Sequence, residues 1–179
     1  MNDLLLLATL LTGPQHGYAL KKKAVLISGQ ADMHNNLVYP LLRRFVREGW
    51  VTRKETAGQR GQTRQVYSLT SRGRQALVQR LCNFSDGAAA SSDEFRLRVG
   101  LFPVLGSSAR AAILDKRQSY LLNRAQRFGP LQREMDLGAY GAEVVRFIRR
   151  QIAAELAWIA RLRRIARRAS QRKAAGNKE

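Results

Sequence analysis

The sequence of residues 34–73 is HNNLVYPLLRRFVREGWVTRKETAGQRGQTRQVYSLTSRG, and its pattern predicts a short helix followed directly by a β-hairpin. The helix is expected to cover residues 37–48. Asn35 or Asn36 can cap its start, and Gly49 suits its end because glycine accepts the left-handed conformation found there. The apolar residues of this segment recur at helical spacing. We therefore expect an inward face made of Leu37, Leu41, Leu42, Phe45 and Val46.

The hairpin is predicted from two β-prone segments, residues 50–52 and 64–69, joined by a turn that contains Gly58, Arg60 and Gly61. A helix followed by a basic hairpin is the arrangement of a winged helix-turn-helix. The helix has the size of the major groove, and the arginines of the wing reach the backbone or the minor groove. The sequence therefore predicts a mainly α fold with a small two-stranded β-wing and a double-stranded DNA partner.

Apolar periodicity on both sides of this stretch predicts the domain organisation. Residues 1–82 are expected to form the winged helix-turn-helix domain, with a fourth helix capped by Thr70 or Ser71. Its core is expected to contain Tyr18, Leu37, Leu41, Phe45, Trp50, Val66 and Leu69. Residues 83–92, NFSDGAAASS, are small and polar and predict a linker. Residues 93–179 are expected to form a helical dimerisation and effector domain.

The second domain is predicted to contain helices over residues 93–101, 108–128 and 139–170, with an interruption at Gly129-Pro130. The last helix carries an apolar stripe, and we expect it to form the dimer contact. Its members are Val145, Ile148, Ile152, Leu156, Ile159 and Leu162. Because Glu155 interrupts the stripe, a mixed bundle within and between subunits is expected, not a simple coiled coil. Phe147 and Trp158 on this helix suggest either an effector pocket or dimer packing.

The formal net charge of the 179 residues is +19 and is spread over both halves of the chain. Such an excess favours nucleic acid as a partner, ahead of anionic membranes or a purely solubilising charge. The apolar run from Leu4 to Leu11 is too short to span a bilayer and lacks the basic flank of a signal peptide. Cys82 is the only cysteine, so no intrachain disulfide forms and a cytoplasmic location is expected.

Enzymatic chemistry is poorly supported by the sequence. The two histidines, His16 and His34, are far apart, no cluster has metal-ligand spacing, and no phosphate-binding loop is present. We therefore expect no catalytic residues, no bound metal and no cofactor.

Several short motifs resemble the PadR family of bacterial transcription regulators. They are the apolar run 4–11, the triplet His16-Gly17-Tyr18, the segment LVYPLL at 37–42, Glu48-Gly49 and the segment YSLTSRG at 67–73. Their order and spacing match the family over about residues 3–82. The resemblance implies a cytoplasmic, homodimeric regulator, with a C-terminal region whose ligand chemistry varies among members. The turn Met33-His34-Asn35-Asn36 departs from the small Ser/Gly turn often found in the family, so the base preference is expected to differ.

The DNA contacts are expected from the second and third helices and from the wing. The candidates are Lys21, Lys22, Asn35, Asn36, Tyr39, Arg43, Arg44, Arg60 and Arg64. One asparagine can act only as a cap, and Tyr39 is more suited to a phosphate than to a base. Arg53 and Lys54 are as readily explained as solvated charges of the hairpin.

Three hypotheses for function follow from the sequence. The first is a homodimeric repressor of an inverted-repeat operator, released by an aromatic or anionic small-molecule effector. The second is a nucleoid-associated or RNA-binding protein without sequence preference, which the diffuse charge suggests. The third is a DNA-binding dimer that mainly sequesters a small molecule.

Overall fold

The computed structural model describes residues 1–28, 35–57, 63–134 and 138–175. The chain divides into two compact units. The first comprises Met1–Phe84 and Ser92–Val104, and the second comprises Ser85–Ser91 and Leu105–Glu179.

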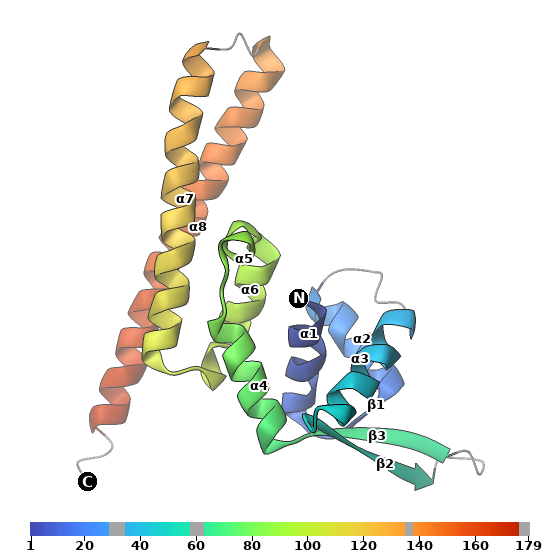
Figure 1. Cartoon of the computed structure of the whole chain (residues 1–179). Coiled ribbons are helices and arrows are strands. Elements are labelled where there is room, and N and C mark those ends of the chain that lie inside the picture. Colours follow the sequence, from blue (N-terminus) through green and yellow to red (C-terminus); the bar gives the residue numbers. More distant parts are fainter. Residues whose placement is uncertain (29–34, 58–62, 135–137, 176–179) are drawn as a thin grey trace. The chain divides into compact units, whose positions relative to one another are not determined.

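The first unit is a group of short helices with a small sheet (Figure 1). Its elements in chain order are α1 (Asn2–Thr9), η1 (Leu10–Thr12), β1 (Gln15–His16), α2 (Gly17–Ser28), α3 (Asn35–Arg47), β2 (Val51–Ala57), β3 (Thr63–Leu69), α4 (Ser71–Cys82), α6 (Ser92–Gly100) and η3 (Phe102–Val104). The predicted helix and wing at residues 34–73 are confirmed as α3, β2 and β3.

The sheet has three antiparallel strands in the order β1-β3-β2, one strand more than predicted. The wing pairs Val51 with Leu69 at its base and Ala57 with Thr63 at its outer end. The additional strand β1 pairs Gln15 with Tyr67. A strand of two residues is too short to show the alternation of apolar and polar residues that identifies a strand in a sequence, so β1 was not predicted.

The core of the first unit differs from the expected one in detail. The buried face of α3 consists of Val38, Leu42 and Phe45. Leu37 is 36% exposed and Tyr18 is 76% exposed, so neither is a core residue. In β3 the buried residue is Tyr67, with the predicted Val66 half-buried. The helical period was correct, since Leu42 and Phe45 are buried as predicted, and Val38 takes the place of Leu37 on the inward face.

The start of α4 is held tightly against the wing. The Thr70 hydroxyl accepts a hydrogen bond from the Gly73 amide at 2.9 Å, so Thr70 is the predicted N-cap. It also donates to the Gly49 carbonyl at 2.7 Å. A Cβ atom at Gly73 would lie 2.0 Å from the carbonyl oxygen of Trp50, so only glycine fits. The end of α3, the wing and the start of α4 therefore meet at one junction.

Helix α6 packs within the first unit, although residues 93–179 were expected to form the second domain. Its Arg98 is 3% exposed and donates from Nε to the Leu81 carbonyl at 3.2 Å. The guanidinium also lies 4.8 Å from the centre of the Phe84 ring. A buried arginine that satisfies the end of α4 is not recognisable as a core residue in the sequence.

The second unit consists of α5 (Asp86–Ala90), α7 (Ser107–Glu134) and α8 (Gly138–Ala175). Helix α5 lies inside the segment predicted as a linker, and α7 continues through the predicted interruption at Gly129-Pro130. The long helices are antiparallel (Figure 1). Their buried apolar residues are Ile113, Leu114, Leu121, Val145, Ile152 and Ile159.

Candidate nucleic-acid interface

Helix α3 presents a polar face opposite its buried one. Asn36, Tyr39, Pro40, Arg43 and Arg47 are exposed and recur at steps of three and four residues. The face therefore combines an amide, a phenol and two guanidiniums along one side of the helix. These are the groups that read base edges and bind phosphates in the major groove.

The wing adds charge beside this face. Arg53 is exposed and pairs in register with Tyr67, so the two side chains lie on the same face of the sheet. Burial raises the pKa of the Tyr67 hydroxyl above its ordinary value. Arg53 and Arg43 oppose this rise in the pKa, while Tyr39 adds to it. Arg53, Arg43 and Tyr39 are therefore close enough to Tyr67 to act on it electrostatically.

A groove of about 460 Å³ lies between the start of α2, α3 and β3. Its lining residues are His16, Gly17, Tyr18, Ala19, Tyr39, Arg64, Gln65 and Tyr67. A Cβ atom at Gly17 would lie 3.0 Å from Cε1 of Tyr39, so glycine allows the tyrosine ring to approach the start of α2. Tyr18, expected in the core, instead lies at this groove and is largely exposed. The groove offers hydroxyl donors and Arg64 beside the polar face of α3.

The other residues predicted to contact DNA differ in their exposure and position. Lys22 is exposed and Lys21 is half-buried on α2. Asn35 is the first residue of α3, and its side chain lies outside the described part of the structure, as does Arg60. Arg47 and Arg53 were not among the predicted contacts. The spacing of Arg47, four residues after Arg43 on the same helix, was the signal that could have identified it.

Arg44 points away from the polar face of α3. It forms an ion pair with Asp3 of α1 and lies 5.4 Å from the centre of the Phe45 ring. Arg80 approaches the same Asp3 carboxylate at 3.7 Å and stacks over Trp50 at 4.5 Å. Arg44 therefore links α3 to α1, and its DNA contact stays a prediction.

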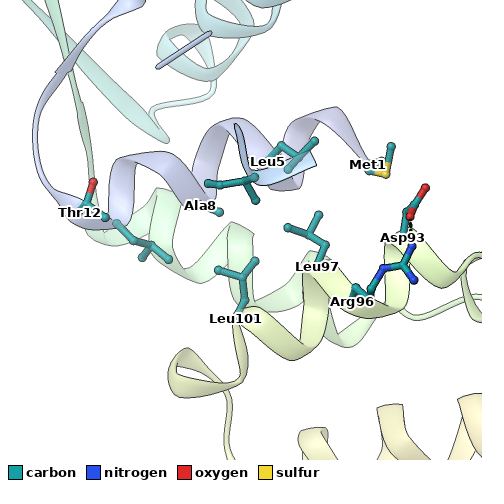
Figure 2. Close-up of a pocket in the computed structure, with 11 residues that line it drawn as sticks. Met1, Leu5, Ala8, Thr12, Asp93, Arg96, Leu97 and Leu101 are labelled. Atoms are coloured by element: carbon teal, nitrogen blue, oxygen red, sulfur yellow. Dashed lines mark hydrogen bonds and ion pairs between the residues drawn. The ribbon is translucent and has the colours of Figure 1, made fainter. Parts of the chain in front are cut away.

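The first unit also contains an apolar pocket of about 540 Å³ between α1, α2 and α6 (Figure 2). Leu5 and Ala8 from α1 lie opposite Leu97 and Leu101 (Figure 2). The exposed ion pair between Asp93 and Arg96 lies at one end of the pocket. Its size and apolar walls are typical of small-molecule sites.

Among the described residues, no group of three or more His, Cys, Asp or Glu side chains could hold a metal ion. In the same part of the chain, no helix is both long and apolar enough to cross a membrane.

Residues 6–79 match the model of the Transcriptional regulator PadR-like family. A PadR family transcriptional regulator from Eggerthella lenta is 31% identical, with 42% of this chain and 63% of that chain covered and a TM-score of 0.37. A transcriptional regulator from Thermoplasma acidophilum is 30% identical, covering 48% and 77%, with a TM-score of 0.40. Bacillus subtilis PadR in complex with operator DNA is 18% identical, covering 92% and 98%, with a TM-score of 0.45.

No curated protein matches the chain.

Proposed function

This chain belongs to the PadR-like family of transcriptional regulators, and from that premise we propose that it binds double-stranded DNA as a homodimer and represses transcription. Members of this family are transcription regulators and not enzymes, in agreement with the prediction from the sequence. A regulator of this kind acts in the cytoplasm, on the nucleoid.

The polar face of α3 is the observation that supports DNA binding most strongly. Tyr39 and Arg43 lie one turn apart on it, and Arg47 continues the face. Arg53 and Arg64 of the wing and Lys22 of α2 add exposed positive charge to the same unit. Lys22 and the wing cations are suited to phosphates, which position a protein on the duplex, while the α3 face reads the bases.

Selection of random duplex DNA on the purified chain at physiological salt tests this function. We expect enrichment of an inverted repeat with half-sites about one helical turn apart, because two copies of α3 then enter successive major grooves. Tight, salt-sensitive binding without an enriched sequence would instead identify a nonspecific polyanion binder, the alternative that the net charge of +19 suggests.

Helix α8 supports the homodimer in a different way from the one predicted. Val145, Ile152 and Ile159 are buried within one chain, so they are not available to a partner. A second apolar face lies beside them and follows a helical repeat. Its members are Tyr140, Val144, Phe147, Ala154, Trp158, Leu162 and Ile165. Tyr140 is 92% exposed and Ile165 is 63% exposed, and a soluble protein usually covers an apolar stripe of this length.

The variant Val144→Glu/Phe147→Glu is expected to convert the dimer to a monomer. Both side chains are 56% exposed in the single chain, so the charges harm the dimer and not the fold of the unit. Light scattering on the protein as it elutes from a size-exclusion column measures the mass of the particle in solution. Arg149→Glu/Arg150→Glu, two exposed positions on the same helix, is the matched control. A mass unchanged from that of the wild type would place the dimer contact elsewhere.

For the effector, we propose the apolar pocket between α1, α2 and α6 in preference to Phe147 and Trp158, which lie on the proposed dimer face. The pocket takes an aromatic compound, and such a ligand releases DNA only if it binds the free form more tightly than the DNA-bound form. Ala8→Trp fills the pocket, since Ala8 is 7% exposed and lies on its wall. We expect aromatic compounds to raise the melting temperature of the wild type but not of Ala8→Trp. Equal shifts for both proteins would exclude this pocket.

A further inference from the structure

A polar cleft of about 590 Å³ lies in the second unit, between α5 and α7. Its lining residues are Asp86, Ala89, Lys116, Ser119, Tyr120, Asn123, Arg124 and Arg127. The volume lies within the range of small-molecule sites. None of these residues belongs to the polar face of α3 or to the apolar face of α8.

The lining residues of α7 form two parallel rows on one side of the helix. Lys116, Tyr120 and Arg124 follow one another at steps of four residues. Ser119, Asn123 and Arg127 form the second row with the same step. Residues four apart lie on the same helix face, so the neutral donors and the cations of both rows line the same side of α7.

The charges of the cleft are unbalanced. Its only carboxylate among the lining residues is that of Asp86, which is 98% exposed and pairs with Lys116 at 2.9 Å. In the described part of the chain, no carboxylate pairs with Arg124 or Arg127. Arg124 lies 5.9 Å from the centre of the Phe128 ring, and this stacking restrains its guanidinium. Two arginines and a lysine therefore face a concave surface with little compensating charge.

We propose that this cleft binds a small anionic molecule that carries phosphate or carboxylate groups. Arg124 and Arg127 offer planar donor pairs that fit such groups, and Lys116 adds a point charge. Ser119, Tyr120 and Asn123 supply neutral hydrogen bonds that orient the molecule. The combination of concavity, neutral donors and cations distinguishes the cleft from the merely basic surface of α8. Anion binding by this cleft does not depend on DNA binding by α3.

Calorimetric titration of the full chain with inorganic pyrophosphate and with citrate tests the proposal. We expect one saturable site per chain for at least one of the two probes, and the preferred probe identifies the ligand as a phosphate or a carboxylate. Arg124→Gln/Arg127→Gln is expected to weaken binding at least tenfold. The control Arg164→Gln/Arg167→Gln removes the same charge from exposed positions of α8 and should leave affinity unchanged.

A further variant separates site loss from misfolding. Arg127→Lys keeps the charge but loses the planar fork, and we expect an intermediate loss of affinity with an unchanged melting temperature. Equal weakening by the cleft and control pairs would overturn the proposal in favour of diffuse attraction. Absence of saturable binding for both probes would also overturn it. If duplex DNA affinity then fell only for the cleft pair, the cleft would be a nucleic-acid surface. Failure of the α3 proposal would change none of these titrations.

Discussion

Replacing Tyr39 and Arg43 together with alanine is expected to lower the affinity for the selected operator about 100-fold, because each good base or phosphate contact contributes about 1–3 kcal/mol. Both side chains project from the exposed face of α3, and neither is part of its buried face of Val38, Leu42 and Phe45. The fold should therefore tolerate the change. Fluorescence anisotropy with labelled operator measures the affinity.

The matched control is Arg72→Ala/Arg74→Ala, which removes two exposed arginines from α4. We expect this pair to weaken operator and random DNA by similar small factors, since loss of general charge acts on all sequences. Tyr39→Phe removes the hydroxyl and keeps the ring that packs against Gly17, so it measures the contribution of the hydroxyl alone. Undiminished operator binding by the Tyr39/Arg43 double variant, with melting temperature and mass unchanged, would show that α3 is not the recognition helix.

The sequence predicted the DNA-binding half well because its signals are local. The end of α3 just before Gly49 and the cap at Thr70 depend on residues adjacent in the chain. The contacts that the sequence did not predict join residues that are far apart in the chain. Arg44 was expected at DNA, but its partner Asp3 lies 41 positions earlier. No periodicity reveals such a pair, and an arginine on a recognition helix has the same local pattern whether it faces DNA or the core.

The second half was predicted less accurately for the same reason. The apolar positions of α8 were recognised, but which of them are buried within the chain was not. Val145 and Ile152 pack within the chain, while Phe147 lies on a neighbouring exposed face. A stripe wide enough for two contacts gives a single helical period in the sequence. Glu155, which interrupted the predicted seam, owes its position to a buried arginine on α7.

That arginine is the centre of the largest stability effect expected in this chain. Arg117 is 1% exposed, and its Nε and Nη2 atoms donate to the two carboxylate oxygens of Glu155 at 2.8 Å each. Its Nη1 donates to the Ala89 carbonyl. The side chain thus joins α5, α7 and α8. Glu155→Gln removes the charge of the carboxylate and leaves Arg117 buried without an anion, which costs about 3–5 kcal/mol of unfolding free energy.

Urea unfolding at fixed protein concentration measures this loss, because the apparent stability of a homodimer, as proposed for this chain, depends on concentration. Glu143→Gln is the matched control, since Glu143 pairs with Arg146 at 3.0 Å and both side chains are more than half exposed. That change should cost less than about 1 kcal/mol. The double variant Arg117→Met/Glu155→Leu should recover most of the stability lost in Glu155→Gln, because removing both charges also removes their desolvation cost. If Glu155→Gln unfolded at the same urea concentration as the control, the buried pair would not be what joins the three helices.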